Sequence, residues 1–183
     1  MKITPGKLAG MKAVSDDRGV IAAAAMDQRG SLKKALGANA GDKELTEFKV
    51  AVSEILTPHA SAILLDPEWG LPAAKARAKN AGLLLAYEKT GYDKALPGRL
   101  PDLLDLWSVR RLKEAGADCI KILLYYTPTD PKHINDHKHA WTERLGDECR
   151  ANDIPFFLEF VGYDEGKDEK GIEIGRASCR ERV

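Results

Sequence analysis

Cys119-Ile120-Lys121-Ile122-Leu123-Leu124-Tyr125-Tyr126 is a short apolar run interrupted by one lysine. Runs of this kind, bounded by polar residues, are typical of strands that are buried on both faces in a parallel sheet. Similar runs occur elsewhere in the chain, at 19–26, 61–65, 82–87 and 153–160. The first is rich in alanine and could form a helix instead, but it is short and a loop-like cluster follows it. We therefore predict five buried strands.

Segments with helical features separate these runs. They begin at capping residues or prolines and cover 31–36, 42–56, a segment from about 71, 102–112 and 131–145. In the longest early segment, the residues with helical spacing that we expect to form the apolar face are Leu45, Phe48, Val52, Ile55 and Leu56. Alternation of strand and helix without a hairpin signal predicts a parallel sheet covered by helices.

Two architectures fit this alternation: an open doubly wound sheet and a (β/α)8 TIM barrel. No Gly-x-Gly-x-x-Gly motif follows the first predicted strand, which weakens the nucleotide-binding version of the open sheet. The chemistry at the strand ends, described below, favours the barrel. We therefore predict an α/β fold, a (β/α)8 TIM barrel that is truncated after about five β/α units.

The composition excludes several functional classes. The chain has 183 residues, of which 44% are hydrophobic, and its 28 basic and 28 acidic residues balance. No basic face indicates nucleic acid or an anionic membrane, and no apolar stretch has the length of a membrane span. The three cysteines, Cys119, Cys149 and Cys179, show neither metal-ligand spacing nor a disulfide pattern. We expect a soluble protein of the reducing cytoplasm.

Ionisable residues lie at the ends of most predicted strands. They are Asp27, Asp66, Glu88 with Lys89, and Glu159, while Lys121 lies inside the fourth strand. Parallel α/β folds build their sites at the carboxyl ends of strands. A barrel would bring these groups into one ring that could bind and deprotonate a small sugar phosphate. The alternative is that such charges only begin solvated loops and cap helices.

Lys121 and Glu159 are the most informative of these residues, because both interrupt apolar runs. A buried lysine is costly unless it is paired or neutral, so Lys121 should bind an anionic substrate group or pair with a carboxylate such as Glu159. The alternative interpretation is that Lys121 has no functional role and that its long side chain carries the amine out to water. A carboxyl group among apolar neighbours has its protonated form favoured, which would suit Glu159 for acid–base work. Its alternative is a purely structural partner of a buried lysine.

Five blocks of the sequence carry a resemblance to a known family. They are 26–32 (Met-Asp-Gln-Arg-Gly-Ser-Leu), 64–70 (Leu-Leu-Asp-Pro-Glu-Trp-Gly), 85–92 (Leu-Ala-Tyr-Glu-Lys-Thr-Gly-Tyr), 115–126 and 154–159 (Ile-Pro-Phe-Phe-Leu-Glu). In order and spacing they resemble the class I tagatose 1,6-bisphosphate aldolase family, from about residue 7 to residue 164. That family has a (β/α)8 barrel and cleaves its ketose bisphosphate to dihydroxyacetone phosphate and glyceraldehyde 3-phosphate.

The resemblance implies a mechanism through a lysine Schiff base, with no metal and no cofactor. It makes Glu159 the proton-transfer carboxylate and Lys121 and Asp27 further catalytic residues. Gln28, Asp66, Glu88 and Lys89 are the expected substrate-binding residues. The imine-forming lysine of the family lies on the sixth strand, beyond residue 183, so we expect this polypeptide as given to be inactive. A related aldolase for another ketose 1-phosphate, such as a sulfonated sugar, and a non-catalytic sugar-phosphate-binding regulator are the alternatives.

The final residues, Ile174-Gly-Arg-Ala-Ser-Cys-Arg-Glu-Arg-Val183, match what a common sequencing-library adapter encodes. We interpret 174–183 as a non-native tail and 1–173 as a partial barrel domain, the alternative being a natural basic tail.

His133 and His137 share a helix face, as zinc ligands can, but the segment is polar and lacks the general base of a zinc-protease motif, which favours a solvated helix. The expected partner is a small-molecule sugar phosphate, with no nucleic acid and no membrane; a homo-oligomer is left open.

Overall fold

The computed structural model describes residues 3–37, 40–89, 92 and 96–163. The strands are β1 (Ala23–Met26), β2 (Ala62–Leu65), β3 (Gly82–Ala86), β4 (Cys119–Tyr126) and β5 (Phe156–Gly162). The helices are α1 (Pro5–Ala13), α2 (Gly30–Leu36), α3 (Asp42–Leu56), a 3-10 turn η1 (Thr57–His59), α4 (Leu71–Ala76), α5 (Val109–Glu114) and α6 (Lys132–Ala151). The expected tail at 174–183 lies outside the described residues, so the predicted domain boundary stays a prediction.

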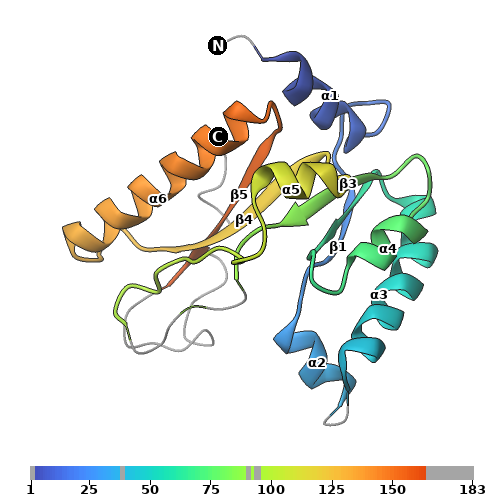
Figure 1. The fold of residues 1–183 in the computed structure, drawn as a ribbon, viewed down its shortest axis with the longest axis horizontal. Helices are drawn as coiled ribbons and strands as arrows, with labels where there is room; N and C mark the ends of the chain where they lie inside the picture. Colours follow the sequence, from blue (N-terminus) through green and yellow to red (C-terminus); the bar gives the residue numbers. More distant parts are fainter. Residues whose placement is uncertain (1–2, 38–39, 90–91, 93–95, 164–183) are drawn as a thin grey trace.

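The strands form one parallel sheet in the order β1-β2-β3-β4-β5, and each strand pairs with the next along the chain. Helices of the β/α units lie along the outside of the sheet, with α6 on one side and α3 and α4 on the other (Figure 1). The sheet curls into a half-barrel. The predicted α/β class and partial (β/α)8 barrel are confirmed, with five parallel strands and described helices after the first four.

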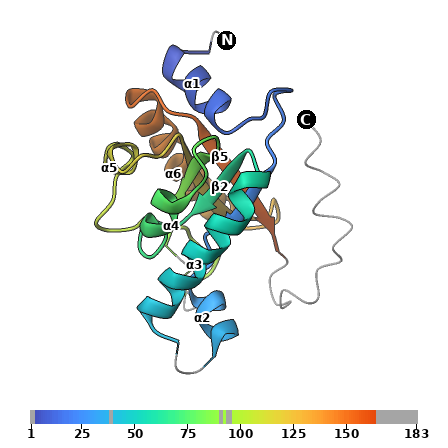
Figure 2. The same cartoon turned by 90° about the vertical axis from the view of Figure 1, so that its right-hand side faces the viewer.

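The two faces of the sheet bury different sets of residues because side chains alternate along each strand. The convex face packs under the helices and includes Ile63, Leu65, Leu85 and Ile120, all fully buried. On the concave face Ala62, Leu84 and Cys119 meet Val14, which follows α1. α1 lies beyond the amino ends of the strands (Figures 1 and 2). The sequence interpretation had not identified this helix.

The predicted helix from residue 102 is wrong over its first half. Leu103 forms an antiparallel bridge with Glu88, and Leu104 donates its N–H to the carbonyl of Tyr87. Backbone groups used in this way cannot close helical turns, so α5 begins only after Ser108, whose side chain accepts the N–H of Arg111.

The apolar face predicted for α3 is right for Leu45, which is buried, and wrong at its carboxyl end. Ile55 is 67% exposed and Leu56 44%, whereas the buried residues of α3 are Leu45, Lys49 and Ser53. These three follow an i, i+4, i+8 row, and the two polar members are buried because each has a specific acceptor. Ser53 donates to the carbonyl of Ala73 at the start of α4, and Lys49 binds groups at the ends of β1 and β2.

Within the described part of the chain, no helix is both long enough and apolar enough to cross a membrane.

Candidate active site

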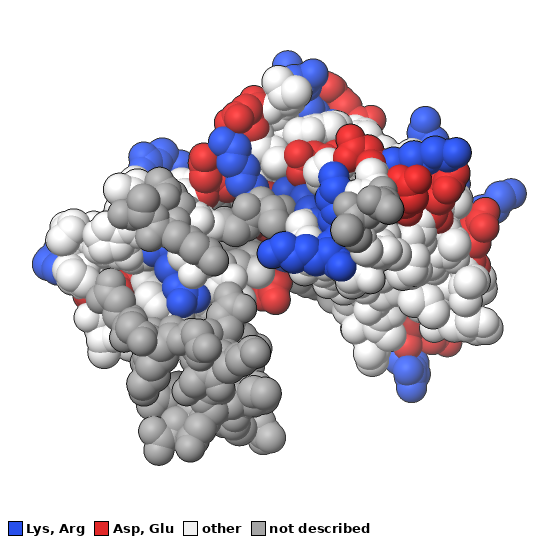
Figure 3. Space-filling model, turned by 90° about the horizontal axis from the view of Figure 1, so that it is seen from below, with Lys and Arg blue, Asp and Glu red and all other residues white. Residues whose placement is uncertain are grey.

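A cavity of about 270 Å³ opens at the carboxyl ends of the strands. Acidic and basic side chains lie next to one another on this face of the molecule (Figure 3). The residues that line the cavity are Asp27, Gln28, Arg29, Ser31, Glu88, Lys89, Arg99, Pro101, Asp102, Lys121, Leu123, Tyr125 and Glu159. Six of the seven residues predicted from sequence are therefore brought together, and Asp66 is not.

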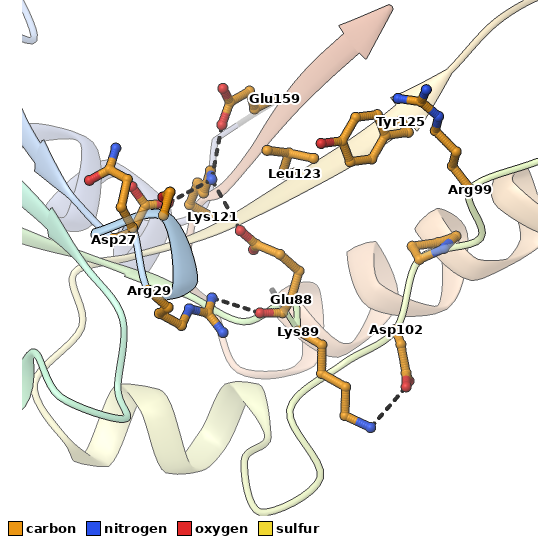
Figure 4. A pocket seen from close by; sticks show the side chains of 13 residues that line it. Asp27, Arg29, Glu88, Lys89, Arg99, Asp102, Lys121, Leu123, Tyr125 and Glu159 are labelled. Atoms are coloured by element: carbon orange, nitrogen blue, oxygen red, sulfur yellow. Dashed lines mark hydrogen bonds and ion pairs between the residues drawn. The ribbon is translucent and has the colours of Figure 1, made fainter. Parts of the chain in front are cut away.

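Lys121 lies at the centre of this group (Figure 4). Its Nζ is 2.8 Å from Asp27 Oδ2, 3.1 Å from Glu88 Oε1 and 2.9 Å from Glu159 Oε2. β1 and β4 are three strands apart, which in a flat sheet would separate them by roughly 14 Å. The contact with Asp27 is therefore possible because the sheet curls, and it joins the first and fourth strands across the barrel interior.

The three carboxylates keep Lys121 charged. Burial alone would lower the pKa of its ammonium group, but the negative charges of Glu88 and Asp27 and the hydrogen bonds to Asp27 and Glu159 outweigh burial. The net effect raises the pKa of Lys121 above its usual value. Lys121 is thus a fixed cation and not a free amine, and the interpretation as a lysine that reaches water is wrong, because its side chain is only 6% exposed.

The buried carboxyl group of the site is Glu88, not Glu159 as the apolar neighbours of Glu159 suggested. The Glu88 side chain is 10% exposed and that of Glu159 is 52% exposed. Burial raises the pKa of Glu88, and Lys121 counteracts this only in part. Glu159 lies on β5, the last strand of the described sheet, and its carboxylate lines the cavity beside Lys121.

Asp66 does not line the cavity, although it follows β2 at the same level as Asp27 follows β1. Its carboxylate is fully buried, accepts the N–H groups of Glu68 and Trp69, and forms an ion pair with Lys49. The same ammonium of Lys49 donates to the carbonyls of Met26 at 2.7 Å and Gln28 at 2.8 Å. In this structure Asp66 therefore anchors the backbone around Asp27 and is not positioned to touch a substrate.

Lys89 and Arg29 at the mouth of the cavity form ion pairs with carboxylates of the loops. Lys89 forms ion pairs with Asp102 at 2.9 Å and Asp105 at 2.8 Å, and the hydrogen bonds to these carboxylates raise its pKa. Arg29 is buried and binds Glu68 Oε2 at 3.0 Å and the carbonyl of Glu88 at 2.8 Å. Gln28 lines the cavity next to Arg29.

Several lining residues were not identified from the sequence, above all Arg29, Arg99 and Asp102. Arg29 lies inside the conspicuous 26–32 block, which could have indicated it. Asp102 was interpreted as a helix start, and nothing local distinguishes Arg99 from a surface arginine.

In the described ranges, no group of three or more His, Cys, Asp or Glu side chains could hold a metal ion, and His133 and His137 are exposed on α6.

Comparisons with a family model and with individual known proteins both identify aldolases as relatives of this chain. A family model described as DeoC/LacD family aldolase matches residues 21–180. The chain is 59% identical to tagatose 1,6-diphosphate aldolase 2 of Enterococcus faecalis over 90% of its own length and 50% of that protein. It is 55% identical to a tagatose 1,6-diphosphate aldolase of Listeria monocytogenes, over 93% of this chain and 52% of the relative. The chain thus spans about half the length of the curated relatives it matches.

Proposed function

Because this chain belongs to the DeoC/LacD family of aldolases, we propose that it forms one side of the active site of a class I aldolase. The proposed reaction is cleavage of tagatose 1,6-bisphosphate to dihydroxyacetone phosphate and glyceraldehyde 3-phosphate. The names of the relatives supply the substrate, and the resemblance supplies the Schiff-base chemistry. The activity is proposed for a protein of the relatives' full length.

The observation that carries the proposal is the ammonium of Lys121 among three carboxylates at the floor of the cavity. A class I aldolase needs a lysine imine as an electron sink and separate groups that move protons. Because the pKa of Lys121 is raised, this lysine is a poor nucleophile and a poor proton donor, and we assign it an electrostatic role. Its fixed charge would stabilise the negative charge that develops on a substrate hydroxyl.

Glu159 is the carboxylate to which we assign proton transfer, because the resemblance gives it this role and its carboxylate lines the cavity 2.9 Å from Lys121 Nζ. In the cleavage step it would take the proton of the hydroxyl on carbon 4, so that this oxygen forms the aldehyde. The bond between carbons 3 and 4 would then break, and its electron pair would move into the protonated imine. Protonation of the resulting enamine and hydrolysis would release dihydroxyacetone phosphate and free the lysine.

The test uses the full-length protein with tagatose 1,6-bisphosphate and a coupled assay for dihydroxyacetone phosphate. Glu159→Gln should lower kcat by about 100- to 10,000-fold, the usual contribution of a general acid–base group. Glu47→Gln on α3, which removes an exposed glutamate that does not line the cavity, is the matched control and should leave kcat unchanged. If the wild type releases no dihydroxyacetone phosphate, the proposed reaction is wrong; binding without cleavage would favour a sugar-phosphate-binding regulator.

For the 183-residue chain by itself we expect no aldolase activity. Among the described residues, the two lysines that line the cavity, Lys89 and Lys121, are both bound to carboxylates. Neither offers the neutral amine that an imine requires. A dihydroxyacetone phosphate adduct trapped on this chain by borohydride would contradict the expectation.

We also propose a reducing, cytoplasmic setting, which the free buried thiols of Cys119 and Cys149 support.

A further inference from the structure

Arg99 differs from the other cations that line the cavity. Lys121, Lys89 and Arg29 each form at least one ion pair with a carboxylate. No carboxylate of the described residues lies within ion-pair distance of Arg99. Its guanidinium lies instead over aromatic rings, 4.8 Å from the ring centroid of Tyr92, 5.2 Å from that of Tyr125 and 4.6 Å from that of Tyr163.

This environment holds the charge without neutralising it. Cation–π contacts fix the plane of a guanidinium, but the rings carry no formal charge and accept no strong hydrogen bond. Nη1 of Arg99 is buried and has no hydrogen-bond partner in the described part of the structure. A buried donor without an acceptor is costly, and an anionic ligand group would supply the acceptor that is missing.

The backbone that carries Arg99 has an unusual conformation. Gly98 has a φ of 85° and Arg99 a φ of 46°, a region that residues other than glycine rarely occupy. A Cβ on Gly98 would lie 2.4 Å from Cγ2 of Ile134, so this position requires glycine on two grounds. Non-glycine residues in the left-handed region occur preferentially at functional sites, and here the conformation directs Arg99 to the mouth of the cavity.

The position of Arg99 in the fold indicates which part of a ligand it would meet. It belongs to the loop between β3 and α5, and in Figure 4 Leu123 and Tyr125 separate it from Lys121. Strand 3 of an eight-stranded barrel lies across the axis from strand 7, and the loops after strands 7 and 8 commonly bind one phosphate group. A ketose bisphosphate carries phosphates at both ends, so its second phosphate would point toward the β3 side.

We propose that Arg99 is the binding residue for the terminal phosphate of the aldehyde half of the sugar, the group on carbon 6 of the ketose bisphosphate. This inference rests on the proposed function and adds a specificity-determining residue to it. The guanidinium would bind the phosphate through charge-assisted hydrogen bonds, for which its planar donor arrangement is well suited.

The experiment compares two substrates of the full-length protein, tagatose 1,6-bisphosphate and tagatose 1-phosphate, which lacks the phosphate on carbon 6. Arg99→Met should raise KM for the bisphosphate by about 10- to 100-fold, the usual effect of one lost hydrogen bond to a charged group. It should leave kcat/KM for the monophosphate within about twofold. Arg99→Lys, which keeps the charge, should recover part of the loss, and Arg110→Met, an exposed arginine on α5, should change neither substrate.

Product inhibition shows which of the two phosphates of the substrate Arg99 binds. Arg99→Met should weaken inhibition by glyceraldehyde 3-phosphate and leave inhibition by dihydroxyacetone phosphate unchanged. An equal loss for both substrates would show that Arg99 is only structural, and an unchanged bisphosphate KM would show that it does not bind the phosphate; either result overturns the proposal. If the wild type cleaves neither sugar, the proposed function fails, and the subsite is judged by titration with glyceraldehyde 3-phosphate. A shift of the Arg99 Nε–H NMR signal supports the subsite, and no shift overturns it.

Discussion

Replacing Lys49 with methionine should lower the free energy of unfolding far more than replacing Lys43, the other lysine of α3. The Lys49 and Asp66 side chains are both 0% exposed, and the ammonium also donates to the carbonyls of Met26 and Gln28. In the variant the carboxylate of Asp66 would keep only the N–H groups of Glu68 and Trp69. Removing one partner of a buried ion pair costs about 3–5 kcal/mol, because the other charge stays buried without compensation.

The assay is urea unfolding followed by circular dichroism. With a denaturant dependence of about 2 kcal/mol per molar urea, a loss of about 4 kcal/mol lowers the midpoint by about 2 M. Lys43→Met on the same helix is the matched control, since Lys43 is 79% exposed in an i, i+4 pair with Glu47. Exposed pairs of this kind contribute about 0.3–0.5 kcal/mol, so the control midpoint should move by no more than about 0.3 M.

A double variant tests the physical reason. Lys49→Met combined with Asp66→Leu should recover much of the lost stability, because it removes the unpaired charge. If Lys49→Met lowers the midpoint no more than Lys43→Met does, the buried pair does not stabilise the fold and the reasoning is refuted.

Two other predictions concern titration and packing. Burial raises the pKa of Glu88 above its usual value of 4.5, so its contribution to stability is fully present below about pH 4.5 and is lost as the pH rises through the folded-state pKa. Glu88→Gln cannot lose a proton, so its urea midpoint relative to the wild type should rise between pH 4 and pH 7; a difference independent of pH would contradict this. Gly10→Ala should destabilise by about 1–3 kcal/mol, because the added Cβ would lie 2.3 Å from the carbonyl of Asp118 and α1 would have to move. Gly146→Ala in α6, where nothing lies within 4 Å of the added Cβ, should instead stabilise by about 0.5–1 kcal/mol, and thermal unfolding of both variants distinguishes the outcomes.

The sequence predicted the strands well because a strand buried on both faces requires a continuous apolar run, which is a local property. Four of the five runs differ from the observed strands by no more than about three residues at either end, and the parallel order follows from the helical segments between them. Lys121 was identified for the same reason, since a lysine inside such a run needs a partner wherever the run is placed.

Errors arose where long-range hydrogen bonds replaced local preferences. Asp102 has the character of a helix cap, yet it binds Lys89 and its segment pairs with Glu88 in the loop after β3. Lys49 breaks the apolar spacing of α3, yet it is one of the buried residues of that helix, because acceptors from β1 and β2 surround its ammonium. A helical period identifies apolar residues and does not reveal a polar residue that finds buried partners.

The sequence by itself determined the α/β class, the parallel order of the strands and the ionisable groups at their carboxyl ends. Only the tertiary structure decided how those groups are paired: Asp27 and Glu88 with Lys121, and Asp66 with Lys49 behind the site. It also decided that Glu88 is the buried carboxyl group and Glu159 the open one. The reason is that periodicity depends on neighbours along the chain, whereas burial and charge pairing depend on the curl that brings distant strands together.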